Sequence, residues 1–132
     1  MAGLEPLAQS VAKANGWDET TRAMMLASKS LNTLDAALRN DDTRVRGCES
    51  AVWLAQNDVA PFDFKAYSDS KIIRGVLAVL LEKANLLSRH ERQVFDFDAY
   101  LRQAGLHRHL SESRANGITE VIKRIQQLSV ER

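Results

Sequence analysis

The fold is decided by the stretch Lys71-Ile72-Ile73-Arg74-Gly75-Val76-Leu77-Ala78-Val79-Leu80-Leu81, which ends in the longest apolar run of the chain. Ser68 or Ser70 can cap a helix that runs from about Lys71 to Leu87, because a serine hydroxyl accepts a hydrogen bond from a free N–H of the first turn. This helix would be apolar on nearly every side, which is typical of a helix at the centre of a domain. Its six-residue apolar run, Val76–Leu81, is far shorter than the roughly 20 residues of a membrane span.

Further helices are expected on both sides of this central helix. Apolar residues at spacings of three and four predict a helix from Asp18 to about Leu38, and they are Met24, Ala27, Leu31, Leu34 and Leu38. The other expected helices are shorter or follow the centre, and run from near Leu4 to Asn15, Arg89 to Val94, Asp98 to Ala104 and Glu112 to Leu128. Gly105 is expected to terminate the helix Asp98–Ala104, and Ser111 to cap the helix Glu112–Leu128.

Three segments between the first helices and the central one have the pattern of strands. They are Thr43–Arg46, Ser50–Ala55 and Phe62–Tyr67, and the last alternates with the period of a half-buried strand. No linker is long enough to divide the chain. The sequence therefore predicts a single α+β domain over residues 1–132, with helices flanking a small three-stranded antiparallel sheet.

The composition narrows the function classes. Among 132 residues, 18 are Lys or Arg and 17 are Asp or Glu, so the formal net charge is only +1. This balance argues against a non-specific nucleic-acid binder, which needs a clear cationic excess. The first residues lack the basic start and the apolar stretch of a signal peptide, so we expect no membrane association and a cytoplasmic protein.

Cys48 is the only cysteine of the chain. An internal disulfide and any all-cysteine metal or iron–sulfur site within one chain are therefore excluded, and we expect no metal site. A lone cysteine usually packs as a small hydrophobe. Here, however, Cys48 follows Gly47 at the polar tip between two expected strands, where we expect Arg44 and Arg46 to favour the thiolate and Glu49 to oppose it.

A thiolate on such a tip could accept sulfur from a persulfide of another protein, because that step is a displacement at sulfur with the geometry of thiol–disulfide exchange. The absence of a second cysteine removes the intramolecular attack that would destroy the resulting persulfide. These residues are compatible with sulfur transport.

Other functions remain open from the residues alone. A Cys/His thiol hydrolase would need His90, His107 or His109 within hydrogen-bond reach of Cys48. A redox-sensing or interaction domain would use the same thiol for mixed disulfides. The three histidines are expected to be structural or exposed, and Trp17 and Trp53 to pack in the core or in a cavity wall.

Three blocks resemble the SufE/CsdE family of sulfur acceptors, which serve cysteine desulfurases. The most specific block is Val45-Arg46-Gly47-Cys48-Glu49-Ser50-Ala51-Val52-Trp53, and the others are Ile73–Leu80 and Leu106–Gly117. The block around Gly47-Cys48-Glu49 and the apolar helix are closer to the CsdE branch, whereas the short N-terminus is closer to SufE.

The resemblance implies that Cys48 takes sulfur from the persulfide of a desulfurase that depends on pyridoxal phosphate. It implies an accessory protein that is not itself an enzyme, that stimulates the desulfurase and that passes sulfur to an iron–sulfur scaffold or another acceptor. It implies a fold shared with such scaffolds, with a cysteine loop that caps an apolar cavity and swings outward. Partner-binding positions would be Gly47, Glu49, Asp69 and Arg114, with no bound cofactor beyond a transient persulfide.

Overall fold

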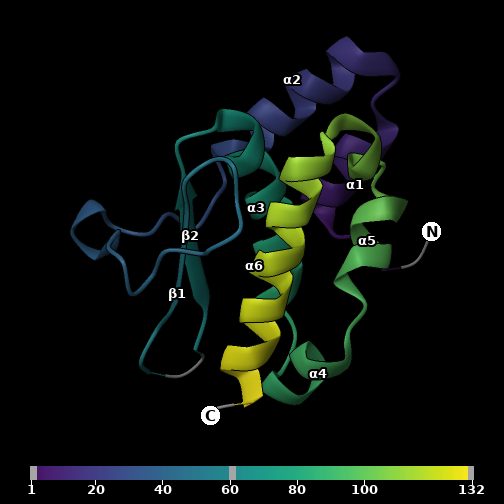
Figure 1. Cartoon of the computed structure of the whole chain (residues 1–132). Coiled ribbons are helices and arrows are strands. Elements are labelled where there is room, and N and C mark those ends of the chain that lie inside the picture. Colours follow the sequence, from purple (N-terminus) through teal and green to yellow (C-terminus); the bar gives the residue numbers. More distant parts are fainter. Residues whose placement is uncertain (1–2, 60–61, 131–132) are drawn as a thin grey trace.

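The helix α3 (Lys71–Ala84) lies at the centre of the molecule, as the apolar stretch predicts. The structure is a computed structural model that describes residues 3–59 and 62–130. Ser70 caps α3 by accepting a hydrogen bond from the N–H of Ile73 at 3.3 Å, and the helix ends three residues earlier than expected. In Figure 1, α6 (Glu112–Val130) lies in front of α3, with the sheet on their left and α1 (Pro6–Lys13) on their right.

The later helices agree closely with the expected ranges. They are α4 (Arg89–Val94), α5 (Phe97–Gln103) and α6, where Ser111 accepts from the N–H of Arg114 in the first turn. The short 3₁₀ helix η2 (Leu106–His109) was not expected from the sequence. The helix α2 (Gly16–Ser28), by contrast, stops well before Leu38. Leu31 and Leu34 are buried as their spacing requires, but the segment that carries them is extended.

The early end of α2 has a physical reason in the sheet. The N–H of Leu34 donates to the C=O of Ala66 at 3.0 Å, and the N–H of Ala66 donates to the C=O of Asn32 at the same distance. These bonds satisfy backbone groups that a longer helix would have paired internally. Only residues Ala36–Leu38 return to a helical turn, the 3₁₀ helix η1.

The sheet has two strands in the described part of the chain, so the prediction of three is corrected. Strands β1 (Val52–Gln56) and β2 (Phe64–Ser68) are antiparallel, with Val52 opposite Ser68 and Gln56 opposite Phe64. The segment Thr43–Arg46 forms only an isolated bridge, between Arg44 and Trp53. A turn closed by the side chain of Asn40 precedes this segment, and Gly47 follows it with φ +87°. The backbone therefore turns away from β1 on both sides of the bridge.

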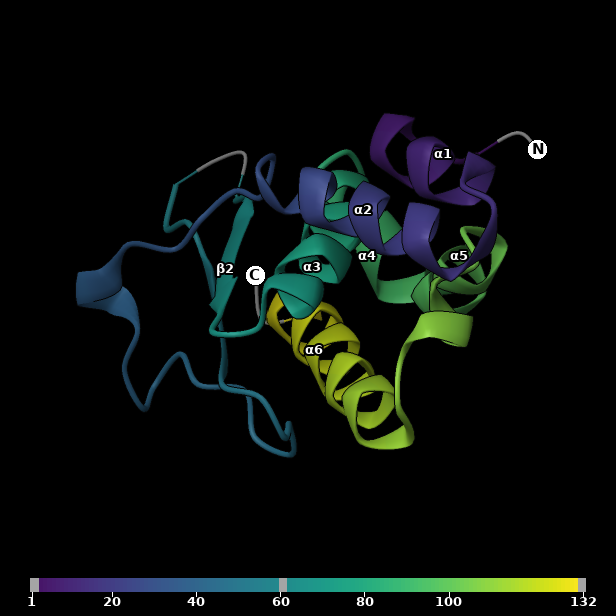
Figure 2. The same cartoon turned by 90° about the horizontal axis from the view of Figure 1, so that it is seen from above.

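The α-helices of the described residues lie on one side of the sheet (Figure 2). The side chains that face the helices are buried, and they are Val52, Leu54, Phe64, Ala66 and Ser68. The opposite face carries half-buried side chains, including Trp53, which agrees with a packing role. Trp17 does not, because it is 62% exposed on α2. Within the described ranges, no helix is long and apolar enough to cross a membrane.

Gly75 sets the distance between α2 and α3. A Cβ atom at this position would overlap the carbonyl oxygen of Met24 and would lie 2.9 Å from its carbonyl carbon. The backbones of the two helices therefore pack directly against each other, with no room for a side chain between them.

Candidate functional site

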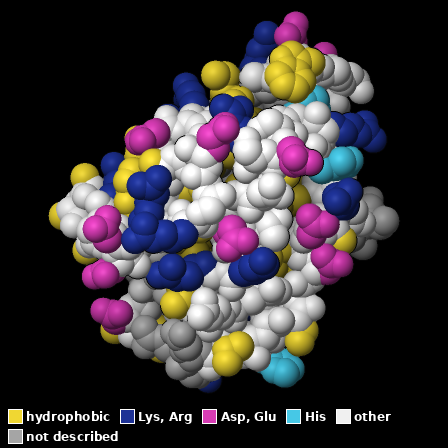
Figure 3. All heavy atoms as spheres, in the orientation of Figure 1, with side chains coloured by type: hydrophobic (Ala, Val, Ile, Leu, Met, Phe, Trp, Pro, Cys, Tyr) yellow, Lys and Arg dark blue, Asp and Glu magenta, His cyan; other side chains and the backbone are white. Residues whose placement is uncertain are grey.

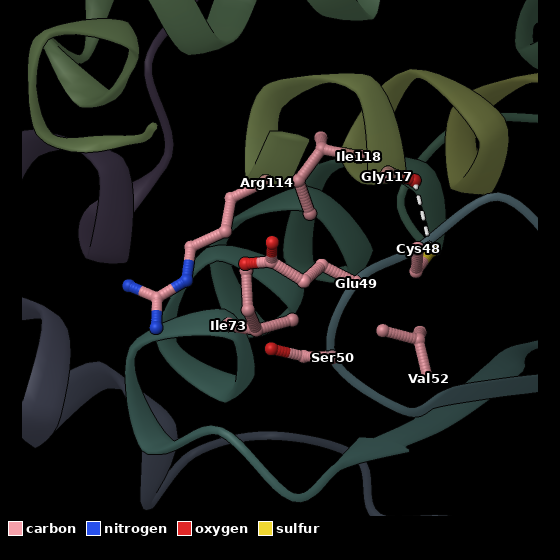
Figure 4. Close-up of a pocket in the computed structure, with 8 residues that line it drawn as sticks. All are labelled: Cys48, Glu49, Ser50, Val52, Ile73, Arg114, Gly117 and Ile118. Atoms are coloured by element: carbon pink, nitrogen blue, oxygen red, sulfur yellow. Dashed lines mark hydrogen bonds between the residues drawn. The ribbon is translucent and has the colours of Figure 1, made fainter. Parts of the chain in front are cut away.

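Cys48 lies on the loop that leads into β1, with its side chain half-buried. The Sγ donates to the backbone C=O of Gly117 on α6 at 3.4 Å, as the dashed line in Figure 4 marks. The loop is attached at its ends, where the N–H of Val45 donates to Val52 and the N–H of Asp69 donates to Ala51. Among the described residues, no backbone hydrogen bond joins residues 46–50 to another segment.

Two glycines allow this loop to lie close to α6. Gly47 has a φ of +87°, which side-chain-bearing residues rarely adopt, and a Cβ there would lie 3.2 Å from Cγ of Glu120. A Cβ at Gly117 would lie 3.0 Å from Sγ of Cys48. Sequence reasoning assigned Gly117 no role, although a glycine within a helix costs about 1 kcal/mol relative to alanine and so indicates a close approach.

A small apolar pocket lies beside the thiol. It is partly open to solvent and offers about 10 Å³, close to the space of a single water molecule. Its lining residues are Cys48, Glu49, Ser50, Val52, Ile73, Arg114, Gly117 and Ile118. In Figure 4 the carboxylate of Glu49 and the guanidinium of Arg114 both extend toward the same side of this pocket. The expected cysteine loop over an apolar cavity is therefore present, with a cavity that is small.

The structure brings together most of the residues expected from the sequence. Glu49 and Arg114 line the pocket of Cys48, and Gly47 precedes the thiol. Asp69 does not line the pocket and lies exposed between β2 and α3, where its backbone N–H binds the C=O of Ala51 at 3.4 Å. It is thereby attached to the end of the cysteine loop.

The environment of the thiol favours its protonated form. Burial is the largest cause that raises the pKa of Cys48 above its ordinary value, and the carboxylate of Glu120 also raises it. The guanidinium of Arg44 lowers this pKa, as expected from the sequence. The opposing carboxylate belongs to Glu120, one helical turn beyond Gly117, whereas we expected Glu49 in this role; Glu49 is exposed.

The histidines lie away from this pocket. His90 is exposed on α4 and His107 on η2, while His109 packs beside Trp17 with 5.1 Å between ring centroids. Among the described residues that line the pocket of Cys48, none is a histidine. The structure therefore offers no observation in favour of a thiol hydrolase.

Comparison with known proteins agrees with the geometry. A family model described as SufE, Fe-S metabolism associated domain, matches residues 5–129. An uncharacterized SufE-like protein of Rhizobium meliloti is 29% identical over 133 residues, covering 96% of this chain and 94% of the relative. The sulfur acceptor protein CsdE of Escherichia coli is 29% identical over 123 residues, covering 92% and 84%. With its lone thiol on a loop over an apolar pocket, this chain belongs to the SufE family of proteins associated with iron–sulfur metabolism.

Proposed function

We propose that this chain takes a sulfur atom from a pyridoxal-phosphate-dependent cysteine desulfurase onto Cys48, stimulates that enzyme, and passes the sulfur on for iron–sulfur cluster assembly. The observation that carries the proposal is the single thiol on a loop that no backbone bond attaches between residues 46 and 50. Family membership and the name of the CsdE relative support the same role.

The transfer step balances without any further reactant. The Cys48 thiolate attacks the outer sulfur of the donor persulfide, a bond forms between Sγ and that sulfur, and the bond between the donor's two sulfurs breaks. The donor cysteine leaves as a thiolate, and Cys48 carries the persulfide. The chain itself needs no bound cofactor for this step, because the pyridoxal phosphate belongs to the desulfurase.

Cys48 must leave its pocket to react. In the pocket, burial raises the pKa of the thiol and the carbonyl oxygen of Gly117 lies 3.4 Å from Sγ, so an approaching persulfide finds a half-buried atom with a reduced thiolate fraction. When the loop moves outward, the desolvation that raises the pKa is removed and the thiolate fraction increases. In the described part of the chain, the side chain of Cys48 makes one hydrogen bond, from its S–H group to the C=O of Gly117. The outward movement therefore breaks only this weak hydrogen bond of the side chain.

Mass spectrometry of the intact protein tests this proposal. We expect incubation with a cysteine desulfurase of the same organism, pyridoxal phosphate and cysteine to add about 32 Da per sulfur to the chain, and a reductant to remove the added mass. Omission of cysteine is the control. Absence of any sulfur adduct, with a mixed disulfide to a small thiol in its place, would instead support a redox-sensing domain.

We further propose that Gly47, Glu49, Asp69 and Arg114 contact the desulfurase, because they surround or adjoin the cysteine loop. Arg114→Glu is expected to weaken desulfurase binding about fivefold or more, since it places a negative charge beside the pocket. Arg22→Glu, on the exposed side of α2, is the matched control and should leave the dissociation constant within about twofold. Equal binding isotherms for the two variants would remove Arg114 from the interface.

A further inference from the structure

The face of the sheet that points away from the helices carries a second cluster of side chains. Strand alternation places Trp53, Ala55, Lys65 and Tyr67 on this face, opposite the buried set. Trp53 and Tyr67 are direct partners across the two strands, with 6.3 Å between ring centroids. Figure 2 shows no α-helix on this side of the sheet. We call these residues, together with the cations that stack on them, the outer sheet face.

Three arginines from three different segments pack against the two aromatic rings. The Cζ of Arg39 lies 3.5 Å from the ring centroid of Tyr67, and that of Arg74 lies 5.2 Å from the same ring. The Cζ of Arg44 lies 5.4 Å from the ring centroid of Trp53. Nε of Arg39 also donates to the C=O of Leu34 at 2.8 Å, and an N–H group of Arg74 donates to the C=O of Ser68 at 2.7 Å. The stacking and these bonds hold each guanidinium in a fixed orientation, and a guanidinium has five N–H donors, so the terminal N–H groups that remain can bind another ligand.

These cations have no acidic partners among the described residues. None of Arg39, Arg44, Lys65 and Arg74 belongs to an ion pair of the described chain, whose ion pairs join other residues. Nε of Arg44 is also buried without a hydrogen-bond partner. The whole chain has 18 basic and 17 acidic residues, so without these four cations acidic residues outnumber basic ones in the rest of the chain. The small positive charge of the chain therefore depends on the cations of this face. Figure 3 shows Lys and Arg side chains gathered left of centre on one face of the molecule, with Asp and Glu side chains at the edges of the group.

The chemistry of this face favours carboxylates. A guanidinium fixed by an aromatic ring loses little conformational entropy when it forms a bidentate pair with a carboxylate. Nucleic acid fits less well, because bases bind by stacking on free aromatic faces and here guanidinium groups already pack against both rings. The face is also next to the reactive loop, since Arg44 precedes Cys48 by four residues.

We propose that the outer sheet face binds an acidic surface of the cysteine desulfurase, so that the partner is held by the sheet while its persulfide meets Cys48. The identity of this partner rests on the proposed function. The acidic chemistry of the ligand rests only on the stacked, unpaired cations.

The first experiment compares two charge reversals in desulfurase binding. We expect Lys65→Glu to weaken binding about fivefold to tenfold and to reduce its salt dependence, because a central cation becomes repulsive. Lys13→Glu, an exposed reversal at the end of α1, should stay within about twofold of the unmodified chain. Lys65→Gln should give an intermediate value, which separates loss of charge from a folding defect. Equal dissociation constants for Lys65→Glu and Lys13→Glu would overturn the proposal.

A second experiment does not depend on the desulfurase. The chain has two tryptophans, Trp53 on the outer sheet face and Trp17 on α2, so their indole N–H signals in NMR distinguish the two sides. We expect hexaglutamate at low ionic strength to shift the Trp53 signal and leave the Trp17 signal unchanged. Equal shifts, no shift, or tighter binding of a single-stranded RNA oligonucleotide to the same face would each contradict an acidic protein ligand.

The two proposals fail in distinguishable ways. If Lys65→Glu binds the desulfurase normally and still receives sulfur on Cys48, the outer sheet face is not the docking surface and the sulfur-acceptor function stands. If Cys48 of the unmodified chain receives no sulfur, the proposed function and the identity of the partner both fall, and the hexaglutamate titration alone decides whether the face binds carboxylates.

Discussion

Replacement of Cys48 by serine is expected to abolish sulfur uptake and to reduce desulfurase activity to its basal rate, while the fold stays intact. A hydroxyl does not attack a persulfide sulfur as a thiolate does, so the acceptor step has no nucleophile. The folded state loses only a weak contact from Sγ to Gly117, so we expect the free energy of unfolding to change by less than about 1 kcal/mol.

The measurement follows alanine and sulfide release by the desulfurase with and without the variant, beside a denaturation curve. Ser50→Ala is the control, because Ser50 lines the same pocket without a thiol. Full stimulation by Cys48→Ser would show that the chain activates the desulfurase without accepting sulfur, and the role assigned to Cys48 would be wrong.

The second large effect concerns stability. Gly75→Ala is expected to lower the free energy of unfolding by about 2 kcal/mol, because the new methyl group collides with the backbone of Met24 and forces α2 away from α3. Backbone atoms of a packed helix cannot rotate aside as a side chain can. The intrinsic helix preference of alanine, about 1 kcal/mol over glycine, offsets only part of this cost.

Urea denaturation checks this expectation, with Gly117→Ala as the matched control. Both glycines lie within helices and neither has a positive φ. At Gly117 the added methyl meets Sγ, Cβ and Cα of Cys48, which belong to a loop that can move, so we expect unchanged or slightly greater stability. If both variants lose the same stability, the backbone contact at Gly75 is not the reason.

The sequence predicts helices best where apolar periodicity and capping residues agree. Ser70 caps α3, one of the two serines expected there, and α4 has the expected ends. The predicted end of α2 was wrong, because Leu31 and Leu34 keep a helical spacing although their segment pairs with β2. Apolar spacing indicates which residues are buried, and it does not indicate how the backbone is hydrogen-bonded. The predicted strand Thr43–Arg46 was also wrong. The turn before it and Gly47 after it limit its pairing with β1 to one bridge.

Local patterns could not assemble the candidate site. Cys48 and Gly117 are 69 positions apart, and their contact depends on how α6 packs against the loop. Arg114 and Asp69 were predicted as partner-binding positions by the resemblance alone. Glu120 was missed because its effect on the pKa of Cys48 arises only in the folded chain. Trp17 was expected inside and is exposed, since composition alone does not place an aromatic side chain.

The smallness of the pocket beside Cys48 has a thermodynamic consequence. A persulfide places a second sulfur about 2 Å from Sγ, and in the small pocket next to Gly117 this larger group competes for space with the lining residues, which favours displacement of residues 46–50. In the proposed function, sulfur loading and the outward position of the loop are therefore linked equilibria. Suppose that sulfur loading shifts the loop equilibrium outward by some factor. By reciprocity, a protein that binds only the displaced loop then binds the persulfide form of this chain more tightly than the sulfur-free form, by up to the same factor.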